Sequence, residues 1–183
     1  MSKAKAKSRR RPPDDPDELE QRLRRHLELL GLTHTLEHLD DHLAWAIAEK
    51  PAVSVLLERV LGAEAQHKLE QRIERRIQLS GLPERKTLEA FDWAFQPDLD
   101  KPLVLELARL DFVGRAEDLL FTGKAGTGKS HILKALGLRA CQRQLRVRYA
   151  RCVDLLDDLY AGLADGTYAR RPKAWARPDF LII

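Results

Sequence analysis

The chain has 183 residues, of which 44% are hydrophobic and 33% are charged. This composition is typical of a soluble globular protein with one domain, or with one small domain and part of another. No apolar run reaches the ~18 residues of a membrane span, and the charged start lacks the apolar stretch of a secretory signal. Cys141 and Cys152 have no CxxC spacing, which favours reduced thiols and a cytoplasmic location.

The positive net charge of +4 belongs to the start of the chain. Residues 12–183 carry 26 basic and 28 acidic groups, because six of the 32 basic residues come before them. The six are Lys3, Lys5, Lys7, Arg9, Arg10 and Arg11. Residues 1–13 cannot bury apolar surface and are predicted to be a disordered basic tail. Such a tail can neutralise nucleic-acid phosphates, or it can serve only to keep the chain soluble.

Residues 14–81 are predicted to form a helical region. Asp15 and Pro16 indicate the start of a first helix, which Gly31 ends. A second helix is predicted from a Thr33 cap up to Pro51. Its expected buried face carries Leu36, Leu39, Leu43 and Ile47. In residues 52–79 the apolar stripes before and after Gly62 do not align, which predicts two helices or a kink there.

Two polar faces of this region are candidate binding surfaces. Helical spacing relates His34, His38 and His42 and can hold zinc, but neighbouring acidic residues make a solvated polar face the better interpretation. These neighbours are Glu37, Asp40 and Asp41. Further along, a basic face suits contact with nucleic-acid phosphates, or a solvated helix with internal ion pairs. It consists of Lys68, Arg72, Arg75 and Arg76.

Residues 82–110 are predicted to be a connector. Phe91, Trp93 and Phe95 alternate strictly, which predicts an extended strip that attaches to a neighbouring domain. Base stacking is the less favoured interpretation, because no basic residue is interleaved with them. A short helix is expected over residues 103–110.

Residues 111–183 show a βαβαβ pattern, which indicates part of a P-loop core. Strands are predicted over residues 119–122, 145–150 and 180–183, and helices over 131–143 and 153–163. The predicted fold class is therefore α/β: an N-terminal helical region followed by an incomplete parallel P-loop sheet flanked by helices.

The motif GKAGTGKS fits the phosphate-binding pattern G-x-x-x-x-G-K-[ST] between a predicted strand and a predicted helix. It comprises Gly123, Lys124, Ala125, Gly126, Thr127, Gly128, Lys129 and Ser130. The glycines let backbone N–H groups turn toward a phosphate. Lys129 is expected to reach the β- and γ-phosphates, and Ser130 to hold Mg²⁺. A glycine-rich turn that binds nothing is the alternative, which the strand and helix around the motif disfavour.

From residue 36 onward the chain resembles the IstB-like transposition helper ATPases of the AAA+ group, which are close to DnaC-type helicase loaders. The segments that carry the resemblance are RIERRIQLSGLPERKTLEAFDWAFQPDLD (72–100), RAEDLLFTGKAGTGKSHILKALGLRAC (115–141), VDLLDDL (153–159) and ARPDFLII (176–183). The phenylalanine-rich segment before the motif, followed by GTGKSH and ALGLRAC, narrows the resemblance to this family.

This resemblance implies a parallel AAA+ sheet, ATP and Mg²⁺ as ligands, and homo-oligomers on DNA. It also implies that the helical region meets a transposase or DNA. In the family an Asp-Glu pair, the Walker B acids, follows the strand that ends here at Ile183. We therefore expect a chain truncated before these acids, with ATP hydrolysis only in a completed chain. Asp179 is expected not to replace them, because it precedes the strand.

Three alternatives remain open at this stage. The first is a non-catalytic remnant that binds nucleotide or DNA only, and the second is a DnaC-like helicase loader. The third, a small-molecule P-loop kinase, is weakened by the long helical region that precedes the motif.

Overall fold

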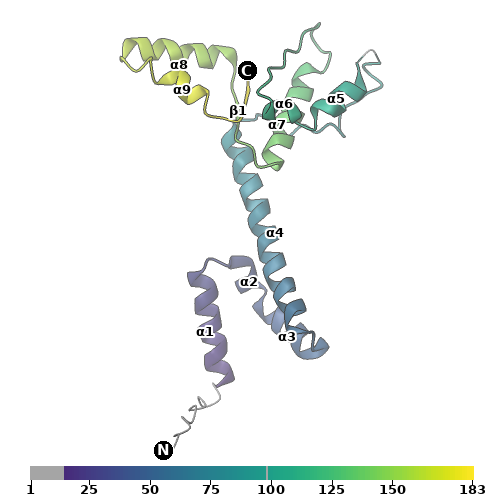
Figure 1. Ribbon diagram of the computed structural model, residues 1–183, viewed down its shortest axis with the longest axis vertical. Helices are drawn as coiled ribbons and strands as arrows, with labels where there is room; N and C mark the ends of the chain where they lie inside the picture. The colour runs from purple at the N-terminus through teal and green to yellow at the C-terminus, as the bar shows by residue number, and fades with distance from the viewer. Residues whose placement is uncertain (1–14, 98) are drawn as a thin grey trace, which may run out of the picture. The chain divides into compact units, whose positions relative to one another are not determined.

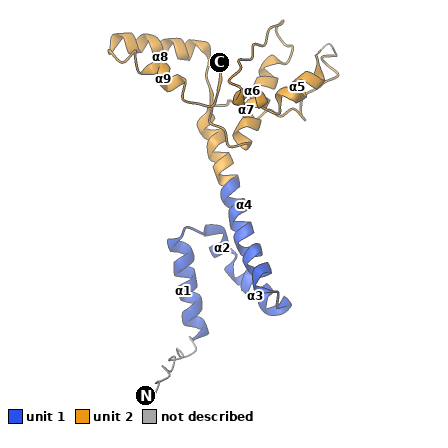
Figure 2. Cartoon of the chain, viewed as in Figure 1, with its two compact units in different colours: residues 1–69 blue, residues 70–183 orange. Residues whose placement is uncertain are grey.

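The computed structural model describes residues 15–97 and 99–183, so the predicted basic tail and its six cationic residues lie outside the described part. The chain divides into two compact units, residues 1–69 and 70–183 (Figure 2). Helices dominate both units, and the second also contains a small parallel sheet (Figure 1). Within the described residues, none of the helices combines the length and the apolar character that crossing a bilayer requires.

The first unit begins with α1 (Pro16–Leu29), as the capping pattern predicts. The Asp15 carboxylate accepts a hydrogen bond from the Asp17 N–H at 3.2 Å, and Pro16 fits the first turn because it has no N–H to leave unpaired. Leu27 is buried. Gly31 follows the helix with a φ of +64°, a left-handed conformation that suits glycine at a helix end.

The single helix predicted after Gly31 is wrong, because the structure has two: α2 (Thr33–Glu37) and α3 (Leu39–Glu49). The backbone leaves helical geometry at His38, and Thr33 is the first residue of α2 rather than its cap. The expected buried face is also only partly right, since Leu39 is buried whereas Ile47 is 75% exposed. The break at His38 redirects the apolar stripe, which explains why one helical period does not describe the segment.

The helix α4 (Val53–Ser80) is continuous over 28 residues, so of the two alternatives predicted at Gly62, two helices or a kink, the first is wrong. Glycine costs a helix interior only about 1 kcal/mol relative to alanine, and the rest of a long helix can offset that. The apolar stripe before Gly62 is also largely exposed, at Val53, Leu57 and Leu61. The misaligned stripes therefore reflect incomplete burial of one helix rather than a break.

In the second unit the connector forms turns, so the predicted extended strip is wrong. The Asp92 carboxylate accepts hydrogen bonds from the N–H groups of Ala94 and Phe95, at 3.0 and 3.2 Å. This side-chain turn bends the chain between the aromatic residues. The connector continues into α5 (Lys101–Leu107), which Asp100 caps and which begins and ends earlier than predicted. The four-residue α6 (Asp111–Gly114) follows.

The remaining elements of the second unit are α7 (Lys129–Gln142), β1 (Val147–Tyr149), α8 (Cys152–Ala164), α9 (Arg171–Trp175) and β2 (Phe180–Ile182). The strands β1 and β2 pair in parallel, with Val147 opposite Phe180 and Tyr149 opposite Ile182. The buried face of α7 packs in the core together with the sheet. These observations confirm the mixed α/β class and the parallel strand pair.

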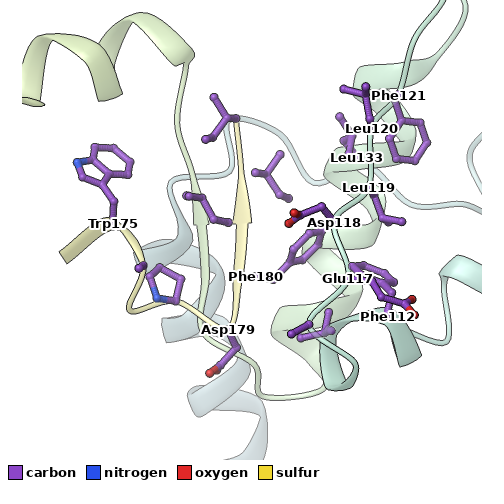
Figure 3. Close-up of a pocket in the computed structure, with 17 residues that line it drawn as sticks. Phe112, Glu117, Asp118, Leu119, Leu120, Phe121, Leu133, Trp175, Asp179 and Phe180 are labelled. Atoms are coloured by element: carbon purple, nitrogen blue, oxygen red, sulfur yellow. The ribbon is translucent and has the colours of Figure 1, made fainter. Parts of the chain in front are cut away.

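The strand predicted over residues 119–122 is not formed: the sheet of the described residues consists of β1 and β2, and the segment pairs with neither. Leu119 and Phe121 pack into the core, but Leu120 is 88% exposed. A cavity of about 540 Å³ lies between this segment and β2 (Figure 3). Apolar side chains alone do not define a strand when its backbone has no partner.

Candidate functional site

The motif 123–130 lies immediately before and within the first turn of α7. Gly123, Gly126 and Gly128 have φ angles of +143°, +79° and +82°. Side chains with a Cβ disfavour this region of backbone space. The conformation therefore explains why the motif has glycine at these three positions, and it turns successive peptide groups within a short loop.

The N-terminus of α7 supplies hydrogen-bond donors. Gly128 is the N-cap residue, and no side chain caps the helix among the described residues. The Ile132 N–H donates to the Gly128 carbonyl at 3.0 Å, and the N–H groups that precede it have no acceptor within the helix. These donors and the positive end of the helix dipole favour an anionic ligand.

The Lys129 side chain folds back over the loop that precedes it. Its Nζ donates to the carbonyl oxygens of Gly123 and Lys124, at 2.8 and 2.6 Å. The Thr127 hydroxyl donates to the same Lys124 carbonyl at 2.9 Å. The ammonium group is thus held among the backbone groups of the loop, where a phosphate can replace the carbonyls as its partner.

Ser130 meets the chemical requirements of a magnesium ligand. It is exposed in the first turn of α7, next to Lys129. A hydroxyl oxygen is a hard ligand of the kind that Mg²⁺ prefers, and Mg²⁺ usually takes few protein ligands together with phosphate oxygens. The donors of the loop and this hydroxyl therefore fit a phosphate–magnesium group.

The connector forms one wall of the loop, a relationship that sequence reasoning missed. A Cβ at Gly128 would come within 2.5 Å of the Phe91 ring. Phe91 also makes an edge-on contact with the His131 ring, with centroids 5.2 Å apart, and His131 Nε2 lies 2.8 Å from the Thr87 carbonyl oxygen. The alternation of aromatic residues indicates that Phe91 packs against a neighbouring part of the protein, but periodicity alone does not identify the surface that it contacts.

Asp179, which was expected not to replace the Walker B acids, pairs with Arg146 at the start of the two strands. Its carboxylate accepts hydrogen bonds from the Arg146 backbone N–H at 2.8 Å and from Arg146 Nη2 at 2.6 Å. These bonds lower the pKa of Asp179 from 3.8 to about 2. The ion pair joins the residue before β1 to the residue before β2.

The candidate nucleic-acid residues of α4 have different environments. Lys68 Nζ donates to the Gly31 carbonyl at 2.6 Å and lies 3.5 Å from Glu64 Oε1, so its charge already has partners within the first unit. Arg76 is half-buried and helps to lower the pKa of Asp179. Arg72 and Arg75 are exposed. Of the four predicted contacts, these two arginines present the most accessible charge.

Comparison with known proteins gives a consistent set of relatives. An ATP-binding protein of insertion sequence IS5376 from Geobacillus stearothermophilus is 30% identical over 165 residues, which cover 90% of this chain and 66% of that protein. A counterpart of IS232 from Bacillus thuringiensis is 27% identical over 163 residues, 89% of this chain and 65% of that protein. A counterpart of IS21 from Pseudomonas aeruginosa is 36% identical over 123 residues, 67% of this chain and 46% of that protein.

The chain thus spans about two thirds of the length of the first two relatives. A family described as "IstB-like ATP binding protein" matches residues 25–183, which include α2 to α9 and the whole motif. The chain therefore belongs to the family of IstB-like ATP binding proteins.

Proposed function

We propose that this chain binds ATP with Mg²⁺ at residues 123–130 and is the ATP-binding module of a transposition helper that acts with DNA and a transposase. The observation that carries the proposal is the loop itself. Three glycines with positive φ lead into the uncapped start of α7, with the Lys129 ammonium among them. The names of the relatives, all ATP-binding proteins of insertion sequences, support the same assignment.

Each part of the loop has a defined role in this proposal. The backbone N–H groups and the start of α7 bind the phosphates. Lys129 exchanges its carbonyl partners for phosphate oxygens and compensates their charge. Ser130 gives its hydroxyl oxygen to Mg²⁺, which neutralises charge on the β- and γ-phosphates when bound.

Calorimetric titration with ATP, with and without Mg²⁺, tests the nucleotide part. We expect Mg²⁺ to strengthen ATP binding to the wild type, and Ser130→Ala to lose most of that gain because the hydroxyl ligand is gone. Ser54→Ala is the matched control, since Ser54 is exposed in the first turn of α4, in the other unit. A wild-type chain that takes up no ATP in the presence of Mg²⁺ contradicts the proposal.

The DNA part of the proposal rests on charge. The first eleven residues carry six basic groups and no acidic group, and the rest of the chain has a net charge of −2. Attraction to DNA should therefore come mainly from these residues, with Arg72 and Arg75 adding a local contribution. Each phosphate contact changes the slope of log affinity against log salt by about −0.9, so four to six contacts give a slope of roughly −4 to −5.

DNA binding measured at several salt concentrations tests this part. Deletion of residues 1–11 should remove most of the slope, whereas Arg72→Gln together with Arg75→Gln should reduce it by at most about two. A deletion that leaves the slope unchanged contradicts the assignment to the first eleven residues. Sedimentation with DNA, with and without ATP and Mg²⁺, then tests for the nucleotide-dependent homo-oligomer, and adding the transposase tests for that contact.

A further inference from the structure

Histidine rings gather in the first unit, where α2 and α4 meet. The ring centroids of His34 and His38 are 4.5 Å apart. The ring of His67, contributed by α4, is stacked on His34 with a centroid distance of 5.0 Å and an interplanar angle of 20°. Three of the six histidines of the chain thus form one contiguous group. One of them, His67, could not be predicted from the helical spacing of His34 and His38.

A carboxylate completes a set of potential metal ligands within this group. The His38 N–H donates to the His34 carbonyl at 3.1 Å, so the two residues lie one helical turn apart. Glu37 belongs to the same turn, and ligand atoms of His34, Glu37 and His38 all lie within 4.8 Å of one another. Tetrahedral zinc with Zn–N distances of about 2.0–2.1 Å needs ligand atoms about 3.3 Å apart. Small rotations of the exposed Glu37 and His38 side chains can close that difference.

The turn that carries these ligands is anchored to α4. The N–H and the hydroxyl of Thr35 both donate to Glu64 Oε2, at 2.8 and 3.0 Å. Thr35 and Glu64 are 2% and 3% exposed. Burial tends to raise the pKa of Glu64, but the Thr35 hydrogen bonds and Lys68 outweigh it and lower the pKa. The carboxylate is therefore a charged acceptor that fixes α2 on α4, and this contact holds His34 against His67.

Two further polar side chains lie close to these ligand residues. Asp41 Oδ2 lies 3.6 Å from His38 Nδ1, a separation longer than a hydrogen bond. His42, one turn beyond His38, is 8% exposed, and neither of its ring nitrogens has a hydrogen-bond partner within the described residues.

We infer that His34, Glu37 and His38 form a binding site for a divalent transition-metal ion, for which Zn²⁺ is the test ion. His67 acts as a positioning residue, because its ring stacks on the ring of His34. Two imidazoles and one carboxylate match the nitrogen and oxygen donors of three-ligand zinc sites. This inference concerns the first unit and is independent of the phosphate loop.

Competition between the full chain and a coloured chelator for Zn²⁺, in the absence of nucleotide, tests the inference. The wild type should take up one ion, and His34→Gln and His38→Gln should each weaken binding by about tenfold or more. His26→Gln is the matched control, because His26 is exposed on α1, and Cys152→Ser excludes uptake by the exposed thiol. Both controls should bind Zn²⁺ as the wild type does.

Two further measurements separate loss of ligation from loss of fold. Far-UV circular dichroism should be the same for all variants, and Glu37→Gln, at an exposed position, provides a third ligand variant that keeps the residue's size. Saturating Zn²⁺ should raise the melting temperature of the wild type more than that of the ligand variants, because binding stabilises the folded state. A wild-type chain that takes up no Zn²⁺, or folded ligand variants that all bind it like the wild type, overturns the inference.

Discussion

The ring of Phe91 lies directly against Gly128, so that a Cβ on Gly128 would meet Phe91 Cε2 at 2.5 Å and Cζ at 2.7 Å. Phe91 is 8% exposed and belongs to the core that also contains Ile132 and Leu136 of α7. The start of α7 and the connector therefore pack as one structure. An aromatic residue far away in the sequence thus packs against the last glycine of the phosphate loop.

The first prediction compares Gly128→Ala with Gly126→Ala. Both substitutions place a Cβ at a φ near +80°, which costs about 1–2 kcal/mol. Only Gly128→Ala also collides with an aromatic ring, because a Cβ at Gly126 meets nothing within 4 Å. Overpacking adds about 1–3 kcal/mol, so urea denaturation should show a greater loss of stability for Gly128→Ala by that amount.

A double variant identifies the source of that difference. Phe91→Leu shortens the side chain that a Cβ at position 128 would strike. Phe91→Leu should therefore lower the stability of the Gly128→Ala variant less than it lowers the stability of the wild type. The proposed contact is contradicted if Gly126→Ala and Gly128→Ala lose the same stability. It is also contradicted if the loss of the double variant equals the sum of the losses of Phe91→Leu and Gly128→Ala.

The second prediction concerns the contact between Thr35 and Glu64 in the first unit. Thr35→Val keeps the shape of the side chain but removes the hydroxyl donor to a buried carboxylate. The loss should be about 1.5–3 kcal/mol, the range for hydrogen bonds to charged groups. Chemical denaturation measures it, with Thr33→Val as the control because Thr33 is exposed. Equal stability of the two variants would show that the hydroxyl contributes nothing.

The third prediction is the pH dependence of the Asp179–Arg146 ion pair. The folded-state pKa of Asp179, about 2, lies below its ordinary value of 3.8. The pair therefore contributes its full stability above about pH 4 and loses it as the pH falls toward 2. Asp179→Asn should lower stability at pH 7 by about 1 kcal/mol, since the pair is partly screened by solvent.

Thermal melts of Asp179→Asn and the wild type should converge as the pH falls below about 4. Asp154→Asn is a suitable control, because Asp154 pairs with Arg151 within one exposed helical turn and joins no separate elements. A difference between Asp179→Asn and the wild type that stays constant from pH 7 to pH 3 would rule out the proposed titration.

The sequence predicted those features that local chemistry determines. The Asp15–Pro16 start of α1 and the helix after the motif are both found in the structure. Glycine, proline and capping residues act on their immediate neighbours, so their effects can be deduced without knowledge of tertiary contacts. The glycines of the motif belong to the same class, because their positive φ angles are a local requirement.

One pairing of distant segments was predicted, the parallel pairing of the segments around Val147 and Phe180, because the alternation of strands and helices indicates it. Other features that depend on distant partners could not be predicted. Residues 119–122 have the apolar character of a strand, but they pair with neither β1 nor β2. The stacking of His67 on His34 and the packing of Phe91 on Gly128 join residues that are remote in sequence. At Gly62 a local signal was misleading instead. Glycine disfavours a helix interior, but α4 continues through it over 28 residues.

The most direct test of the central claim is equilibrium titration of the chain with a fluorescent ATP analogue in the presence of Mg²⁺, comparing Lys129→Ala with Lys124→Ala. The Nζ of Lys129 is held among the loop carbonyls, whereas Lys124 contributes its backbone carbonyl to that arrangement. We predict that Lys129→Ala abolishes binding and that Lys124→Ala leaves the affinity within a few-fold of the wild type. Unchanged affinity in a folded Lys129→Ala variant would contradict the assignment of residues 123–130 as the ATP site.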